Sequence, residues 1–476
     1  MIPDTKAPTP LAGERRVVTV LFADIAGFTS LAESMDPEEV LMRMNECFDI
    51  LVPIIEKYGG SIDKFIGDEI MALFGAPYAH EDDPVRALRA ALEMMKAQQD
   101  HNDGRGIQLS LHIGINTGLA IAGGIGSKGR QTYSVLGDAV NVAFRLKSAS
   151  QPGEILVGPD TFRLTAPLFT FEALDPVQVR GRNEPVSIYR VLEARSQPES
   201  LRGLAGLKSP MVGRQAELTH LIDLTKALCS GVGAAALITG EAGLGKSRLV
   251  MEWRKEVELR TLLPGMQWGG GHCLSYERGL AYHLVAMLLR SVLALPDNTA
   301  ELEASAQLAA QIERLFSDFA DAEARAAALT APLAHLLSLP TSPKESARLS
   351  SLEPQALHTQ YLEAIRLLLI AIAQKAPLVL VVEDFHWIDP SSADLLQGLI
   401  PIVQAAPIFF CIITRPETDS PGWELTHASR QALQNHWQDI QLQRLADHES
   451  QQLIANLLAT DQPPSSITDL VLQKAD

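Results

Sequence analysis

Two aspartates, each near the end of an apolar run, are the residues of this sequence best suited to chemistry. Asp24 lies in the run 16–29, and Asp68 lies in the run 62–75. Both runs read as strands, so the two carboxylates are expected at adjacent strand ends. Such a pair forms a site for hard divalent cations such as Mg²⁺, which prefer oxygen ligands. Two of these ions clamp a triphosphate and lower the pKa of an attacking hydroxyl. The aspartates therefore indicate nucleotide chemistry.

A glycine loop in the second half of the chain indicates another phosphate site. Residues 234–247 read as a strand, a loop and the start of a helix, and they satisfy the pattern GxxxxGK[ST]. In such a loop the glycines let backbone amides wrap phosphates, the lysine reaches the β- and γ-phosphates, and the hydroxyl coordinates Mg²⁺. The residues with these roles are Gly240, Gly243, Gly245, Lys246 and Ser247.

A buried-strand pattern that ends in two acids follows far downstream, over residues 378–384. Its Glu383 or Asp384 is expected to hold the water shell of the same metal, and the sequence does not choose between them. A second apolar strand at 409–416 resembles the sensor strand of STAND and AAA-like ATPases, and this resemblance places its Arg415 near the γ-phosphate. His386 is read as a structural or sensor residue and not as a catalytic base.

The elements that position these residues group into two mixed α/β blocks. Residues 1–14 read as a lead-in, 15–193 as an α+β sandwich, 194–210 as a linker rich in Ser, Gly, Pro and Arg, and 211–476 as a P-loop α/β domain. Within the first block, helices are expected over 37–56 and 84–99, and a half-buried strand over 109–115. Within the second, residues 299–360 read as a helical insertion. The chain stops inside a helix pattern, so the second domain is expected to be truncated.

Composition excludes several classes of protein. The 476 residues exceed one hydrophobic core, and the formal net charge of −17 argues against a nucleic-acid-binding surface. Four scattered cysteines without a CxxC pair indicate a reducing compartment. A membrane span needs about 18 to 20 apolar residues, and the best run, 367–382, is interrupted by polar residues and Pro377. A cytoplasmic protein with no membrane span is expected.

Three motifs in order make residues 15–193 resemble the catalytic domain of class III nucleotide cyclases. They lie at 22–29, 64–69 and 133–145. In that family a ribose 3′-hydroxyl attacks the α-phosphate, and pyrophosphate leaves. The resemblance implies two Mg²⁺ or Mn²⁺ ions per site, held by Asp24, Ile25 and Asp68. It also implies that backbone amides up to Phe28 and Thr29 cradle the β- and γ-phosphates, as helix starts do.

The same resemblance assigns the catalytic and base-reading positions. It gives Asn141 the orientation of the ribose and Arg145 the stabilisation of the transition-state phosphate, a role that suits a planar fork donor. Arg180 or Arg182 is placed on the triphosphate. Each residue taken singly has an ordinary structural explanation, such as a strand-end cap or a solvated lysine. It is the joint match that predicts a site.

Base choice depends on Lys64 and Ser134. The resemblance places Lys64 where a donor reaches adenine N1, which fits adenine and misfits guanine, whose N1 carries a hydrogen. Ser134 stands where many adenylyl cyclases carry Asp and where a soluble, bicarbonate-responsive subgroup carries Thr. The prediction is therefore an adenylyl cyclase, with bicarbonate or another small molecule as its candidate effector. A guanylyl cyclase is the first alternative, and a signalling ATPase or scaffold with a non-catalytic cyclase domain is the second.

Assembly and regulation follow from resemblance as well. In the family the metal aspartates and the Asn/Arg pair of one site come from different domains, so a chain with one such domain is expected to work as a homodimer. The second block is similar to STAND and AAA-like ATPases, through residues 211–217 before its first helix and the strand at 409–416. It is expected to bind Mg-ATP and to regulate the cyclase, either by slow hydrolysis or by switching alone.

Overall fold

The computed structural model describes residues 14–26, 36–80, 82–102, 109–127, 130–177, 185–195, 209–259, 265–274, 278, 280–295, 301–317, 321–458 and 460. Four of the predicted site residues, Phe28, Thr29, Arg180 and Arg182, lie outside these ranges. The chain divides into two compact units, Met1–Gly206 and Leu207–Asp476, and each is described here by itself.

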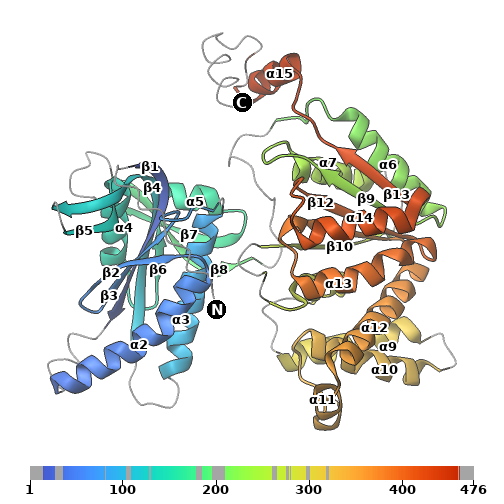
Figure 1. Cartoon of the computed structure of the whole chain (residues 1–476), viewed down its shortest axis with the longest axis horizontal. Coiled ribbons are helices and arrows are strands. Elements are labelled where there is room, and N and C mark those ends of the chain that lie inside the picture. The colour runs from blue at the N-terminus through green and yellow to red at the C-terminus, as the bar shows by residue number, and fades with distance from the viewer. Residues whose placement is uncertain are drawn as a thin grey trace. The chain divides into compact units, whose positions relative to one another are not determined.

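Unit 1 is built on an eight-stranded sheet, counted over the described residues, in the order β2-β3-β1-β4-β6-β8-β7 with β5 paired to β4 (Figure 1). The strands are β1 (Glu14–Ala26), β2 (Ser61–Ile66), β3 (Glu69–Phe74), β4 (Ser110–Ser127), β5 (Arg130–Leu136), β6 (Ile155–Val157), β7 (Phe169–Val177) and β8 (Val186–Ala194). Among the described strands of this unit, most neighbours are antiparallel, and only β4 and β6 pair in parallel.

Helices cover both faces of this sheet. They are α2 (Pro37–Lys57), α3 (Asp83–Asn102), α4 (Asp138–Ala149) and α5 (Pro159–Thr165). One core joins α2 and α3 to the odd-numbered residues of β1 and β4, such as Leu21 and Ile113. A second core joins Ala143 of α4 to even-numbered residues such as Val20. Because successive side chains of a strand point to opposite faces of the sheet, odd-numbered residues enter one core and even-numbered residues enter the other. The α+β sandwich predicted for this block is confirmed.

In the described part of unit 2, five strands form a parallel sheet in the order β10-β11-β12-β9-β13. The strands are β9 (Ala234–Thr239), β10 (Gln267–His272), β11 (Leu378–Glu383), β12 (Ile408–Thr414) and β13 (Trp437–Gln441). The helices are α6 (Gln215–Cys229), α7 (Lys246–Leu259), α8 (His283–Val292), α9 (Glu301–Phe316), α10 (Ala322–Leu336), α11 (Pro343–Ser350), α12 (Pro354–Lys375), α13 (Pro390–Leu399), α14 (Pro421–Leu433) and α15 (Asp447–Leu457). Short 3-10 turns η1 (Phe385–Trp387), η2 (Ile400–Gln404) and η3 (Gln434–His436) complete the set.

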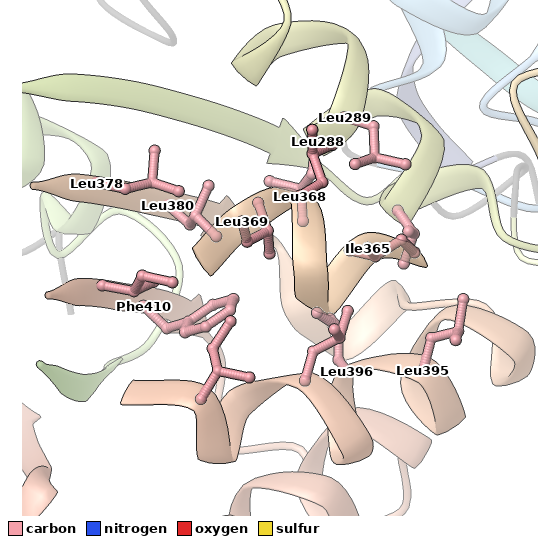
Figure 2. Packing of buried hydrophobic residues seen from close by; sticks show 14 of the residues in the cluster. Leu288, Leu289, Ile365, Leu368, Leu369, Leu378, Leu380, Leu395, Leu396 and Phe410 are labelled. Atoms are coloured by element: carbon pink, nitrogen blue, oxygen red, sulfur yellow. The ribbon is translucent and has the colours of Figure 1, made fainter. Parts of the chain in front are cut away.

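The larger core of unit 2 lies on one face of this sheet. Leucines of α8, α12 and α13 meet Leu380 of β11 and Phe410 of β12 there (Figure 2). The opposite face packs on α6 and α7, where Trp253 is fully buried. Parallel strands buried on both faces read as continuous apolar runs, which is why β11 and β12 were recognisable in the sequence.

The helical insertion predicted over residues 299–360 is present as α9, α10, α11 and the first part of α12. Helix α12 is long and apolar enough, by length and composition, to pass as a membrane span, and 44% of its most apolar window is buried inside unit 2. Its buried residues, among them Tyr361 and Leu368, belong to the core cluster of the sheet. Core helices pass the same test, so this one helix is weak support for a membrane span.

Candidate active site and nucleotide-binding loop

Asp24 and Asp68 lie at one corner of the unit 1 sheet, although their local structure differs from the expectation. Strand β1 is paired with β3 as far as Asp24, and it continues to Ala26 because its pairing with β4 extends that far. Asp68 lies in the two-residue turn between β2 and β3, beside Gly67. Gly67 has a φ of +67°, a left-handed conformation that glycine adopts without the steric cost of a β-carbon, and this allows the tight hairpin. Asp24 thus acts from within a strand and Asp68 from a turn.

The register of the sheet adds charged neighbours that the motifs alone did not reveal. Asp24 is directly opposite Glu69 on β3 and opposite His112 on β4. Lys147, near the end of α4, completes the group. Its Nζ lies 2.9 Å from Asp24 Oδ2 and 3.2 Å from a carboxylate oxygen of Glu69. Three acids, one lysine and one histidine therefore gather at this corner.

His112 links the carboxylate to the helix. Its Nε2 lies 3.4 Å from Asp24 Oδ2, and its Nδ1 lies 3.1 Å from the backbone carbonyl oxygen of Lys147. These contacts fix the orientation of the imidazole ring, as a hydrogen bond to one ring nitrogen usually does. Only strand register could have identified His112, because 88 residues separate it from Asp24 in the sequence.

The acids differ in their ionisation. The hydrogen bond from His112 is the largest cause that lowers the pKa of Asp24 to about 2, and Lys147 adds to it against the effect of burial. Burial raises the pKa of Asp68, and the negative charge of Asp24 raises it further. Burial also raises the pKa of Glu69, which Lys147 only partly offsets. A cation near either carboxylate would favour its ionised form.

These acids suit a hard divalent cation. Asp24 and Asp68 offer oxygen donors of the kind that Mg²⁺ or Mn²⁺ binds, and Glu69 Oε1 is buried without a hydrogen-bond partner among the described residues. Within that part of the chain, no three His, Cys, Asp or Glu side chains converge as a complete metal cage. Mg²⁺ sites commonly use one or two carboxylates and leave the remaining positions to water and substrate phosphates. Ile25 is a buried strand residue beside Asp24.

The two residues predicted to read the base lie together. Lys64 on β2 and Ser134 on β5 are 70 positions apart, and Lys64 Nζ lies 3.5 Å from Ser134 Oγ. Ser134 is buried, whereas the Lys64 side chain is half-exposed and also pairs with Asp63 at 3.0 Å. The pair therefore places an ammonium donor beside a buried hydroxyl.

Asn141 and Arg145 are exposed on α4. At about 100° per residue, the two lie about 40° apart around the helix, and Lys147 lies about 120° and 160° from them. Since Lys147 faces Asp24, the Asn/Arg pair is directed away from the carboxylates of its own chain. The structure does not bring these two predicted catalytic residues to the metal corner.

In unit 2 the glycine loop lies between β9 and α7, at the carboxyl edge of the sheet where α/β folds bind ligands. Gly243 and Gly245 have φ values of +81° and +84°. Lys246 Nζ donates to the carbonyl oxygens of Gly240 and Glu241 at 2.6 and 2.8 Å. Ser247 Oγ contacts a carboxylate oxygen of Glu383. This contact favours Glu383, of the two acids left open, as the partner of the P-loop hydroxyl.

The neighbouring acid and the arginine occupy different positions. Asp384 has a left-handed backbone with φ +52° and leads into η1. The guanidinium of Arg415, directly after β12, lies 5.8 Å from the ring centre of Trp387 in η1. His386 is fully buried, as a structural residue would be. The contact between Trp387 and Arg415 therefore connects the ends of β11 and β12, two strands that are adjacent in the sheet.

Comparison with known proteins accounts for both units. Residues 12–193 match the family described as the adenylate and guanylate cyclase catalytic domain, and residues 210–413 match the AAA ATPase domain. The chain joins a class III cyclase domain to an AAA ATPase domain. An adenylate cyclase of Anabaena cylindrica is 38% identical over 193 residues, which are 38% of this chain and 38% of that protein.

Other relatives extend the comparison. An uncharacterized protein of Rhizobium meliloti is 28% identical over 425 residues, 88% of this chain and 40% of that protein. Adenylate cyclase 1 of the same organism is 31% identical over 187 residues, 38% of this chain and 28% of that protein. Among solved structures, the adenylyl cyclase CyaB from P. aeruginosa shares 36% identity over 39% of this chain and 98% of its own, with a TM-score of 0.37. The cyclase–ATPase chain thus spans 28 to 40% of the length of these three curated relatives.

Proposed function

We propose that this chain is an adenylyl cyclase that converts ATP to 3′,5′-cyclic AMP and pyrophosphate, with two Mg²⁺ or Mn²⁺ ions per site. The observation that carries the choice of base is the contact between Lys64 Nζ and Ser134 Oγ. Adenine presents an acceptor at N1 and a donor at its N6 amino group. An ammonium can only donate, and a hydroxyl can accept, so the pair matches that edge.

The proposed site lies between two copies of the chain. Because α4 directs Asn141 and Arg145 away from Asp24, a second copy has to bring its own α4 to the carboxylates. An exposed apolar set on the sheet supports such a partner: Val17 is paired with Leu119, and Ile121 is paired with Leu136. Their exposed fractions are 62%, 59%, 50% and 59%. Parity places all four on one face of β1, β4 and β5, where a second copy would cover them.

In this proposal the AAA unit binds Mg-ATP and regulates the cyclase. Lys246, Ser247 and Glu383 would contact the phosphates and the metal, and the positive end of α7 would favour the negative charge. Support for binding is the loop geometry together with the contact between Ser247 and Glu383. Hydrolysis in this unit, if it accompanies binding, would act on the γ-phosphate beside Arg415.

The choice of substrate is tested by incubating the purified chain with Mg²⁺ or Mn²⁺ and either ATP or GTP. The cyclic product is identified by mass spectrometry over a protein dilution series. Cyclic AMP as the main product, with specific activity that falls on dilution, is expected. The variant Lys64→Glu should lose the preference for ATP, whereas Lys57→Glu, which alters an exposed pair with Glu93, should keep it. Cyclic GMP as the main product of the wild-type protein would refute the assignment.

Shared sites are tested by mixing two inactive variants, Asp24→Asn and Arg145→Ala. In a mixed dimer one site keeps the intact Asp24 of one chain and the intact Arg145 of the other, and the second site lacks both. Random pairing should therefore restore about a quarter of wild-type activity, since about half of the dimers are mixed and each has one working site. Mixtures no more active than the separate variants would contradict a site built from two chains.

A further inference from the structure

Lys147 is the buried cation of the metal corner, and the family roles assigned to α4 do not include it. Its side chain is 9% exposed, and its ammonium contacts Asp24 and Glu69 at 2.9 and 3.2 Å. It lies on the side of α4 opposite Arg145. A lysine so deeply buried requires compensation, because burial disfavours a charged ammonium. Both carboxylates supply that compensation.

We infer that Lys147 is a positioning residue that occupies the metal-binding oxygens of the free enzyme and has to leave them when the divalent ion binds. The inference rests on the proposed function, in which Asp24 holds a metal ion. It assigns to Lys147 the control of metal affinity: the ammonium holds Asp24 and Glu69 in place, and it competes with the ion for Asp24.

Competition follows from the atoms involved. Lys147 and His112 both contact the same oxygen, Asp24 Oδ2. A divalent ion and an ammonium at one carboxylate oxygen repel each other strongly at this degree of burial. Oxygen atoms that already accept two hydrogen bonds have little remaining capacity for an inner-sphere ligand. A metal ion that takes Asp24 Oδ2 as a ligand therefore has to break the contact between Lys147 and this oxygen.

The ring of Phe144 also attracts the ammonium. While it contacts Asp24 and Glu69, Lys147 Nζ already lies 4.8 Å from the ring centre of Phe144, which is half-exposed and one helical turn earlier in α4. An ammonium over an aromatic face is attracted by the ring quadrupole. The flexible four-carbon stem of a lysine lets the charge move toward this ring and toward solvent without a shift of the helix.

The two other readings of Lys147 make opposite predictions. If Lys147 were only structural, its removal would loosen the acids and weaken metal binding. If it were a substrate contact, its removal would leave metal binding without nucleotide unchanged. Competition alone predicts that metal binding becomes tighter when the ammonium is removed.

The test is a titration with Mn²⁺ in the absence of nucleotide, followed by electron paramagnetic resonance of the free ion, on the full chain. We expect Lys147→Met to bind Mn²⁺ roughly ten- to a hundredfold more tightly, the range over which groups beside metal ligands change affinity. Lys147→Arg, which keeps the charge, should bind close to wild type. Lys57→Met removes a lysine from an exposed ion pair and is the matched control, with no change expected. The variant Asp24→Asn should lose Mn²⁺ binding at this corner, so the binding that it lacks identifies this site in the titration of the wild-type protein.

Equal or weaker Mn²⁺ binding by Lys147→Met would overturn the inference. If the wild-type protein makes cyclic AMP and Lys147→Met does not bind Mn²⁺ more tightly than wild type, only the role of Lys147 is refuted. A protein without cyclic product, and without Mn²⁺ binding that depends on Asp24, would refute the proposed function itself. Should Lys147→Met fail to fold, the side-chain ¹⁵N resonance of Lys147 in the wild-type protein decides. Loss of its restrained signal on Mg²⁺ saturation is expected, and a signal that persists would contradict displacement.

Discussion

Replacing Gly114 with alanine adds one methyl group, which should push α4 away from the active site. It lies on β4, and a β-carbon placed there would come within 2.2 Å of the backbone nitrogen of Lys147 and 2.4 Å of the carbonyl oxygen of Ala143. Both atoms belong to the backbone, so no side-chain rotation relieves the clash. A normal contact needs a shift of α4 by about 1 Å, and displacements of this size in catalytic groups cost about a hundredfold in rate.

Gly114→Ala is therefore expected to lower cyclase activity about a hundredfold and to destabilise unit 1 by roughly 1–3 kcal/mol, the usual cost of overpacking a core. Gly118→Ala is the matched control, because it lies four residues further on the same strand and its nearest neighbour is the side chain of Ala139 at 3.1 Å. Cyclic AMP production and thermal unfolding are measured for both variants, with ATP binding to unit 2 as a check on folding. A Gly114→Ala protein as active and as stable as Gly118→Ala would refute this account of how α4 is positioned.

Three further predictions test separate parts of the chain. The lowered pKa of Asp24 adds up to about 2 kcal/mol of stability above pH 4, and this contribution is lost as the pH falls from about 4 to 2. In EDTA, Asp24→Asn should thus have a lower melting temperature than wild type at pH 7, and the difference between the two melting temperatures should shrink toward pH 2. A difference that stays constant with pH would contradict the link between the ionisation of Asp24 and stability. Glu383→Gln should weaken Mg-ATP binding by unit 2 roughly tenfold or more, as loss of a group that orients a metal ligand does. Asp384→Asn should have little effect, because asparagine tolerates a left-handed backbone, and the opposite ranking in calorimetry would reverse the assignment. Leu136→Glu should give a monomer in sedimentation and abolish cyclase activity while ATP binding by unit 2 persists; an active dimer would exclude the apolar set as the interface.

The sequence predicted those features that depend on local pattern. Parallel strands buried on both faces, the glycine loop and the helix that starts at Pro37 all have signals within a few consecutive residues. Asp24 was predicted at a strand end, but β1 continues two residues past it, because its pairing with β4 extends to Ala26 after its pairing with β3 has ended at Asp24. The choice between Glu383 and Asp384 needed the contact with Ser247, which depends on the order of β11, β12 and β9 in the sheet.

The group around Asp24 could not be predicted for a more general reason. Glu69, His112 and Lys147 reach it through strand register and through the close approach of α4 at Gly114, and neither leaves a periodic signal in the sequence. A lysine two residues after Arg145 reads as one more solvated helix residue. Its burial against two acids emerges only from the tertiary fold.

Helix α4 therefore serves two purposes, and the two faces of the helix separate them. One face carries Asn141 and Arg145, which the proposed dimer would present to the site of the partner, and the other carries Lys147, bonded to Asp24 of its own chain. If a metal ion displaces Lys147, it removes a contact that holds the same helix against β1 and β3. Metal binding at one site would then alter the restraint on the residues that complete the other. A symmetric dimer with this arrangement has a direct physical route between its two sites, without any change in the AAA unit.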